Sequence, residues 1–409
     1  MFSKFNRLMS IVALLVLGVA LVSVGVFLFA RWQADPFAGD AINDPPFTPL
    51  SYSIQTFLWW DEGNASSQAG MVNRVLNFSY IKQTFPWREL EPRPDEWDFT
   101  QSDRIVALAE QWALQLVVRL GQSPDWASGL SSIDDDAHDA PPLELDDWAA
   151  YCATIAERYQ GRIVAYQIWN EPNLQREWGE QAPDPTAYVD LLARCSDAIR
   201  EADPQAIVIS AGLSPTGGPM PIAMPDDQYL DAMYQADFQQ YVDVVGVHAP
   251  GFAPPSYGPD DAEADNDPRW ASFRRVEDLR KIMIRHDDAG RQMAILEFGY
   301  TTDTSNPDYS WFAVSEDLQA QYIVEAYQYA SENWRPWIGL MNLIYLPDSQ
   351  WTAEDEEWWW AIITPDGRAR PAFFALAEMT RYCGERTVSG WTDAYVSEED
   401  WLERRDTCP

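Results

Sequence analysis

Two glutamates lie at the ends of short apolar segments that are typical of buried strands. Glu171 follows the segment Val164–Trp169, and Glu297 lies near the end of Met293–Phe298. A lone carboxylate in such a segment is costly to desolvate unless it is paired or functional. Two carboxylates about 5–5.5 Å apart can cleave a glycosidic bond, because one protonates the leaving oxygen while the other attacks the anomeric carbon. If the fold brings the two glutamates together, they predict this chemistry.

The surroundings of the two glutamates give two further expectations. The two-residue period of a strand predicts that Glu297 shares a face with Ile295, opposite Leu296. Partial burial and the neighbouring carboxylate would raise the pKa of the acid toward the working range.

These side chains need a fold in which several strands end on one side. From about residue 52 the chain alternates eight short apolar segments with amphipathic ones. The expected strands are Ser53–Leu58, Phe78–Thr84, Leu116–Leu120, Val164–Trp169, Ala206–Ala211, Val242–His248, Met293–Phe298 and Ile338–Ile344. The expected helices include Ser102–Trp112, Asp146–Tyr159, Thr186–Glu201, Gln228–Gln240, Arg274–His286, Asp317–Glu332 and Ala372–Tyr382. This alternation predicts an α/β fold, a (β/α)8 TIM barrel over residues 52–382.

An open, doubly wound sheet is the structural alternative. No GxGxxG or Walker sequence opens an expected helix, which disfavours a nucleotide-binding sheet, and we expect no cofactor. In a closed barrel, active sites lie at the C-terminal ends of the strands. Asn170, Glu171, His248 and Glu297 would then face one mouth.

The N-terminus differs from the barrel. An uncharged apolar run, Leu8–Ala30, follows two basic residues. Its length suits a membrane-spanning helix, which needs roughly 20 residues. We therefore expect a transmembrane signal anchor over residues 1–31 and a linker over 32–51, with the body held at the cell membrane outside the cytoplasm. Cleavage after Ala30 is the alternative and would make the protein secreted.

The cysteines fit export from the cytoplasm. Cys152 and Cys195 fall in consecutive expected helices, whereas Cys383 and Cys408 could clip the C-terminal tail, residues 383–409. None forms a CxxC pair, which excludes zinc ribbons and thioredoxin-like redox sites. We therefore expect two disulfides, and four buried thiols are the alternative.

Charge and composition restrict the ligand. The chain carries 28 Lys and Arg against 64 Asp and Glu, a formal net charge of −36. This excess excludes electrostatic binding of nucleic acid and disfavours polyanionic substrates. Only three His occur and no HExxH sequence is present, so we expect no His-based metal centre. A neutral oligo- or polysaccharide remains the expected partner.

The segments around the glutamates resemble the paired signatures of a known clan. Trp169-Asn-Glu-Pro-Asn173 and Ile295-Leu-Glu-Phe-Gly299 are similar to those of clan A, the (β/α)8 retaining glycoside hydrolases. This clan includes the cellulase-like family 5 and the family 39 and 42 β-glycosidases. Phe85-Pro-Trp-Arg-Glu-Leu-Glu-Pro92 and Gln122-Ser-Pro-Asp-Trp126 resemble the stretches after its second and third strands. The resemblance covers nearly all of residues 52–382.

The resemblance implies a retaining O-glycosyl hydrolase, with Glu171 as acid/base and Glu297 as nucleophile. It implies that Asn170 hydrogen-bonds the 2-hydroxyl of the sugar, an interaction that strengthens in the transition state. It further implies that His248 contacts the substrate near the nucleophile.

Two positions depart from the clan. Many family 5 enzymes carry Arg on the second strand, where this chain has Lys82. The aromatic residue that commonly orients the nucleophile has no clear counterpart, and Tyr300 is the nearest candidate.

Tryptophan is abundant, with 20 residues, and flat indole faces suit the apolar faces of sugar rings. We expect Trp87 and Trp126, which follow the second and third strands, to line the substrate site.

Two alternatives to hydrolysis stay open. A transglycosylase would use the same residues and differ only in the acceptor. A non-catalytic carbohydrate-binding surface protein would keep the barrel without the chemistry, although the presence of both glutamates and Asn170 disfavours it.

Overall fold

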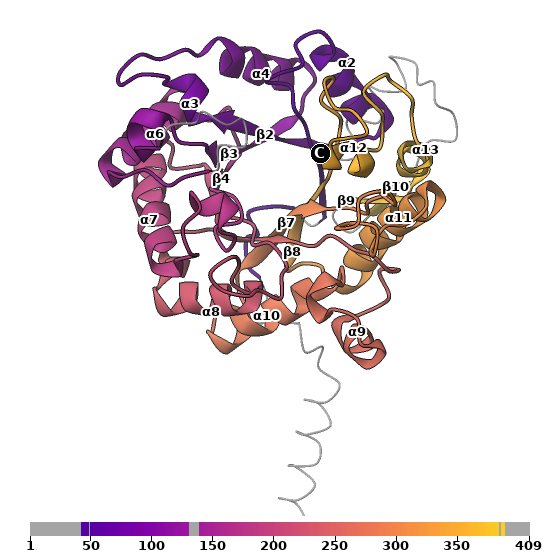
Figure 1. The fold of residues 1–409 in the computed structure, drawn as a ribbon. Helices are drawn as coiled ribbons and strands as arrows, with labels where there is room; N and C mark the ends of the chain where they lie inside the picture. The colour runs from indigo at the N-terminus through magenta and orange to yellow at the C-terminus, as the bar shows by residue number, and fades with distance from the viewer. Residues whose placement is uncertain (1–41, 49, 131–138, 384–385, 389–409) are drawn as a thin grey trace, which may run out of the picture.

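A computed structural model describes residues 42–48, 50–130, 139–383 and 386–388. Eight parallel strands close into a barrel in chain order, with β1 pairing both β2 and β8 (Figure 1). The strands are β1 Ser51–Gln55, β2 Tyr80–Pro86, β3 Gln115–Gly121, β4 Ala165–Ile168, β5 Ile207–Ile209, β6 Val244–His248, β7 Gln292–Phe298 and β8 Ile338–Leu343. The predicted TIM barrel is confirmed, and each predicted strand overlaps an observed one.

Helices surround the barrel and cover its outer face (Figure 1). They are α2 Ala65–Gly70, α3 Trp87–Leu90, α4 Thr100–Gln111, α5 Asp125–Ser128, α6 Leu145–Arg158, α7 Pro185–Ala202, α8 Asp226–Gln235, α9 Pro259–Asp265, α10 Arg275–Arg285, α11 Glu316–Asn333, α12 Glu356–Trp360 and α13 Pro371–Glu378. Helix α7 begins where Asp184 accepts hydrogen bonds from the backbone N–H groups of Thr186 and Ala187, with proline at its first position. Ser315 caps the start of α11, where its hydroxyl accepts a hydrogen bond from Leu318 N–H.

The last predicted helix, Ala372–Tyr382, is too long. Helix α13 ends at Glu378, and the chain then forms an antiparallel pair, β9 Arg381–Cys383 with β10 Arg386–Val388. The buried Arg381 guanidinium donates to the carbonyl of Leu376 and so satisfies a carbonyl at the end of α13. The boundary that we predicted between residues 382 and 383 therefore falls inside a hairpin.

The barrel interior is apolar at the end opposite the strand C-termini. Phe47, which precedes β1, is fully buried there against Val117, Ala165 and Leu340. Its backbone N–H donates to Gln292 Oε1 at 2.9 Å, and its carbonyl accepts from Gln292 Nε2 at 3.0 Å. The end of the predicted 32–51 linker is thus part of the barrel. A second, larger apolar core fills the layer between strands and helices.

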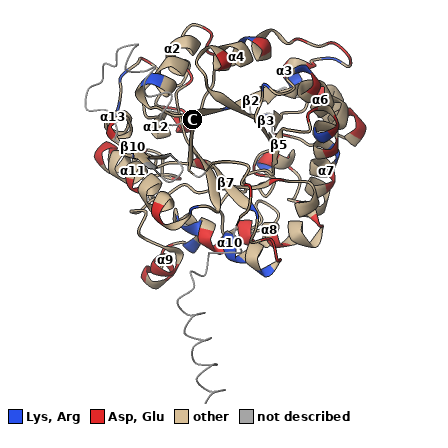
Figure 2. Ribbon diagram, turned by 180° about the vertical axis from the view of Figure 1, so that it is seen from behind, with Lys and Arg blue, Asp and Glu red and all other residues tan. Residues whose placement is uncertain are grey.

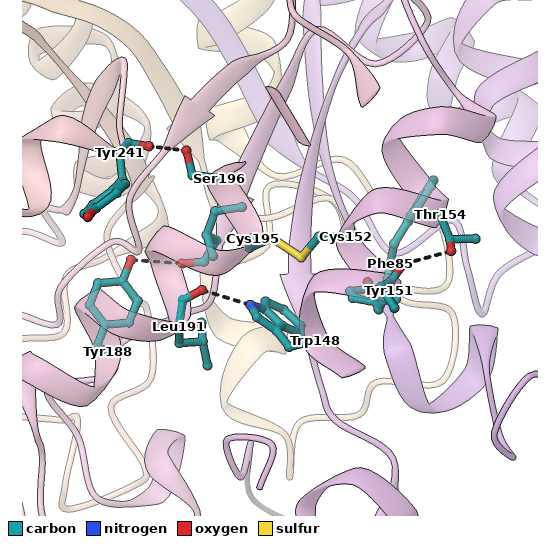
Figure 3. Close-up of a disulfide and its surroundings, with 12 residues drawn as sticks. Phe85, Trp148, Tyr151, Cys152, Thr154, Tyr188, Leu191, Cys195, Ser196 and Tyr241 are labelled. Atoms are coloured by element: carbon teal, nitrogen blue, oxygen red, sulfur yellow. Dashed lines mark hydrogen bonds between the residues drawn. A yellow bond between two sulfur atoms is a disulfide. The ribbon is translucent and has the colours of Figure 1, made fainter. Parts of the chain in front are cut away.

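A disulfide joins two outer helices. Cys152 of α6 and Cys195 of α7 are bonded as expected, with a Cα–Cα distance of 5.4 Å (Figure 3). Trp148 of α6 donates its Nε1–H to the carbonyl of Leu191 in α7, 3.1 Å away. The side chain of Cys383 and all of Cys408 lie outside the described residues, so the second disulfide stays a prediction.

Acidic residues are spread over the outer helices, whereas several basic residues gather at α10, which contains Arg275, Arg280, Lys281 and Arg285 (Figure 2). The predicted anchor, residues 1–31, lies outside the described part of the chain. Of the helices within that part, none has the length and apolar character needed to cross a membrane.

Candidate active site

The two predicted catalytic glutamates and His248 meet at the C-terminal mouth of the barrel. One carboxylate oxygen of Glu171, one of Glu297 and a ring nitrogen of His248 all lie within 4.8 Å of one another. His248 Nδ1 is 2.8 Å from Glu171 Oε1 and 3.7 Å from Glu297 Oε2. Glu171 is 9% exposed and His248 is 1% exposed, so the cluster is largely shielded from water.

A local irregularity turns Glu297 toward the mouth. Ala294 and Leu296 face the barrel interior, while Met293 and Ile295 pack in the outer layer, as the two-residue period requires. The pairing of β7 shifts register against both neighbours next to Glu297. Our expectation that Glu297 shares the face of Ile295 was therefore wrong, because the bulge breaks the period.

The end of β4 holds Glu171 in a strained backbone. Trp169 has φ 71° and Glu171 has φ 37°, values that are uncommon for residues other than glycine. Such strain concentrates at functional sites. Glu171 N–H donates to the carbonyl of Gly212 in the segment after β5. A Cβ at Gly212 would lie 2.1 Å from the His248 ring, so only glycine permits this close approach.

Two asparagines of the same loop have different surroundings. Asn173 is fully buried and exchanges hydrogen bonds with the backbone of Ser214, which ties the loop after β4 to that after β5. Asn170 is 7% exposed, beside Glu171, and its Oδ1 accepts from Gln167 Nε2 at 3.3 Å. A contact between Asn170 and a sugar hydroxyl stays a prediction.

Three neighbouring basic side chains lower the pKa of Glu297. Burial alone would raise its pKa, but His248, Lys82 and Arg119 outweigh burial and lower the pKa to about 2. Lys82 is fully buried, and its Nζ lies 3.3 Å from Glu297 Oε1. Burial lowers the pKa of Lys82 itself to about 8, against the opposing effect of Glu297. An ionised carboxylate is the form that can attack an electrophilic carbon.

The pKa of Glu171 contradicts our expectation. Burial and Glu297 do favour its protonated form, but the hydrogen bond and charge of His248, with a further contribution from Arg176, lower the pKa below its ordinary value. The expectation took account of Glu297. It did not take account of the His248 imidazole, which β6 brings next to Glu171.

The two predicted site tryptophans differ in exposure. Trp87 is fully buried, stacks on Tyr151 and donates its Nε1–H to Glu91, so it fills the core and cannot contact a sugar. Trp126 is half-buried, packs edge-on against Trp87 and donates to the carbonyl of Glu91. Its contact with substrate stays a prediction.

The candidate Tyr300 is also displaced from the site. It is fully buried and packs against Tyr322 of α11, on the outer side of β7. Tyr345 lies nearer to the nucleophile. Burial raises its pKa, and the negative charges of the neighbouring Glu297 and Glu357 raise it further. It lies just beyond β8, so the rule that catalytic groups follow strand ends could have identified it.

Arg176 and Glu177 were also missed. Arg176 Nη2 is 3.6 Å from Glu171 Oε2, and its Nε is 3.7 Å from Glu177 Oε1. Burial, followed by the charge of Asp139, raises the pKa of Glu177 to about 8. Arg176 lies five positions and Glu177 six positions beyond Glu171 in the same loop. This closeness in the sequence could have identified them as residues of the site.

The central cluster also has residue types that ligate metals. However, Lys82 and Arg176 already place cationic groups 3.3 Å from Glu297 and 3.6 Å from Glu171. Since fixed positive charges would repel a metal ion, the charges around the cluster disfavour metal binding there.

Comparison with solved structures supports the same fold. A family 39 glycoside hydrolase from Bacteroides cellulosilyticus aligns with a TM-score of 0.57 at 17% identity, covering 81% of this chain and 63% of that enzyme. A family 39 β-xylosidase from Caulobacter crescentus aligns at 0.56 and 17%, covering 82% and 71%. Xylanase 10B from Thermotoga maritima aligns at 0.53 and 15%, covering 80% and 93%.

The chain thus spans less than two thirds of the first of these enzymes. No curated protein matches the sequence. The family model described as cellulase (glycosyl hydrolase family 5) matches residues 59–344, a stretch that includes both glutamates. The chain therefore belongs to glycosyl hydrolase family 5, the cellulase family.

Proposed function

We propose that this protein cleaves β-glycosidic bonds of a neutral oligo- or polysaccharide outside the cytoplasm, with retention of configuration. The separation of the two carboxylates carries the proposal. Oxygens of Glu171 and Glu297 lie within 4.8 Å of one another. Inverting enzymes hold their carboxyl groups about 6.5–9.5 Å apart to admit a water, whereas retaining enzymes hold them about 5–5.5 Å apart.

In the first step, Glu297 attacks the anomeric carbon while protonated Glu171 donates its proton to the glycosidic oxygen. The carbon–oxygen bond to the leaving sugar breaks, and an ester forms between Glu297 and the remaining sugar. In the second step, Glu171 removes a proton from water, which attacks the anomeric carbon and releases Glu297 as carboxylate.

The proton for the first step resides in the Glu171–His248 pair. With the proton on the imidazole, the two groups form an ion pair, which the lowered pKa of Glu171 favours in the free protein. With the proton on Glu171, both groups are neutral and Glu171 is the acid. A bound sugar excludes water from the pair, and a drier site favours the neutral form.

The location rests on the N-terminal sequence and on the disulfide. Disulfides persist in oxidising compartments, and Cys152 is bonded to Cys195. We place the barrel outside the cytoplasm, held by the apolar residues 8–30. In chain recovered from intact cells, both cysteines should react with a thiol reagent only after reduction, and labelling without reduction would contradict this location.

Two substitutions in the full chain test the chemistry on aryl β-glycosides and soluble β-glucans. Glu297→Ala should lower kcat/KM by about 10⁴-fold on every substrate, because it removes the nucleophile. Glu171→Ala should retain activity only on aryl glycosides with good leaving groups, and added azide should accelerate it. Glu180→Gln, an exposed carboxylate in the same loop, is the matched control.

Activity that survives both substitutions would overturn the assignment of the two carboxylates. Inversion at the anomeric carbon would overturn the mechanism. Sugar transfer to an added acceptor in place of water would identify a transglycosylase. Binding without turnover would identify a non-catalytic carbohydrate-binding protein.

A further inference from the structure

An exposed aromatic surface lies beside the catalytic mouth. Trp311, between β7 and α11, is 48% exposed, and it is the one tryptophan among the exposed large apolar residues of the described chain. Its ring centroid lies 5.9 Å from that of half-buried Phe252 and 6.0 Å from that of half-buried Trp270. We call these three residues the aromatic platform.

All three platform residues belong to the catalytic end of the barrel. Phe252 lies four residues beyond His248 at the end of β6, and Trp311 follows β7. Trp270 packs on the segment after β5. Its Nε1 lies so close to Gly217 there that a Cβ on this glycine would be only 2.8 Å away. Gly212, five residues earlier, contacts the His248 ring. Five residues span at most about 18 Å, so the part of this segment next to Trp270 lies within that distance of Gly212, which borders the His248 ring.

The platform rests on further aromatic rings that hold it in place. Phe312 lies 4.7 Å from Trp311, and Tyr257 lies 5.8 Å from Phe252, measured between ring centroids. Exposing such a surface to water costs free energy, and contiguous exposed apolar surfaces usually mark binding sites.

Charge around the platform indicates which sugar it accepts. The Tyr257 hydroxyl donates to Asp265 at 3.1 Å and to Asp267 at 3.0 Å. These carboxylates have no basic side chain within 4 Å among the described residues. A uronate chain would be repelled here, whereas an uncharged pyranose ring presents an apolar face that can stack on indole.

We propose that the aromatic platform is a distal subsite that stacks on an uncharged pyranose of the substrate chain, away from the bond that is cleaved. The inference deepens the proposed hydrolase function and rests on it. It makes the enzyme selective for oligo- and polysaccharide chains over monosaccharide glycosides, because only a chain reaches both the platform and the catalytic pair.

Trp311→Ala in the full chain tests the platform, with Phe374→Ala as the matched control. Phe374 lies on the outer helix α13 and is also 48% exposed. Relative to this control, Trp311→Ala should lower kcat/KM about tenfold on the longest of a series of β-gluco-oligosaccharides, which corresponds to about 1.4 kcal/mol, the upper part of the range for one aromatic contact. It should leave turnover of an aryl β-glucoside unchanged.

An equal loss of kcat/KM on short and long substrates would overturn the proposed subsite, because it would mean that Trp311 only supports the fold of the mouth. No loss on either would overturn it as well. Calorimetric binding of a soluble β-glucan gives a readout that does not depend on turnover. Glucan that binds the wild type without being cleaved, and binds Trp311→Ala about tenfold more weakly, would keep the platform and reject the hydrolase. Absence of binding and of cleavage would reject both.

Discussion

The two ends of the barrel differ in what they bury. At the closed end, Phe47 packs against fully buried apolar side chains such as Val117 and Leu340. At the open end, Lys82, Glu171 and His248 are buried beside the partly exposed Glu297. Burial of apolar groups stabilises a fold, whereas burial of charged groups opposes it unless they are paired.

A short polar network separates the two ends. The Ser53 hydroxyl donates to Asn342 Oδ1 at 2.7 Å, and Asn342 Nδ2 donates to the carbonyl of Leu296 at 2.9 Å. Lys82 Nζ donates to the same carbonyl at 3.1 Å. The closed end therefore supplies stability, while the open end holds charges in an arrangement that serves chemistry. Substitutions at the two ends should therefore change different quantities.

The largest effect should come from Phe47→Ala at the closed end. It should lower the free energy of unfolding by about 3–5 kcal/mol, because it removes a buried aromatic ring and leaves a cavity. Urea denaturation measures this loss, and kcat/KM per folded molecule should stay near that of the wild type. A fall in kcat/KM without a fall in stability would break the proposed division between the two ends.

Lys82→Met at the open end should do the opposite, lowering kcat/KM while leaving the stability nearly unchanged. We expect kcat/KM to fall about 10²-fold, as on removal of one preorganised charged group from an active site. The acidic limb of its pH profile should move upward, because Lys82 lowers the pKa of Glu297. The free energy of unfolding should change little, since the substitution removes the burial penalty of Lys82 along with its attraction to Glu297, and Glu297 keeps Arg119 and His248 as neighbours.

Lys82→Arg sharpens this prediction. In the wild type, the Lys82 cation is lost as the pH rises through its pKa of about 8, and its support of Glu297 is lost with it. Arginine stays charged at this pH, so any alkaline decline that is due to Lys82 should disappear in an active Lys82→Arg variant. If the alkaline decline persisted unchanged in this variant, the titration of another group would be its cause.

The sequence predicted the barrel well, because eight apolar segments alternate with amphipathic ones and each has an observed strand. The strand-end rule also located Glu171, His248 and Glu297. These inferences depend on local periodicity, which a single sequence displays directly. The helix after β8 was overextended because its true end depends on Arg381, a capping residue that acts through the folded chain.

The errors at the site also arise from contacts between residues that are distant in the sequence. Trp87 was assigned to the site by its residue type and its place after β2, but its exposure depends on Tyr151, which α6 brings over it. Glu297 was assigned to the wrong face because register shifts are properties of strand pairs. The pKa of Glu171 depends on His248, which lies 77 residues away in sequence. Long-range contacts decide each of these features.

The smallest and most specific change should come from His248→Asn. His248 lowers the pKa of Glu297, so the acidic limb of kcat/KM, which reports ionisation of Glu297, should move to higher pH when the imidazole is removed, by about one unit or about 1.4 kcal/mol. The alkaline limb reports loss of the proton that Glu171 and His248 share. It should move to lower pH, because Glu171 then holds that proton without the imidazole.

The outer surface offers a matched control for this change. His286 Nε2 lies 2.8 Å from Asp231, the same separation as that between His248 and Glu171. His286→Asn removes an equivalent histidine–carboxylate contact far from the mouth and should leave both limbs in place. If the two variants shifted the profile equally, His248 would act through general stability. If His248→Asn moved only the acidic limb, the imidazole would support the nucleophile alone, and the proton for the leaving group would need another source.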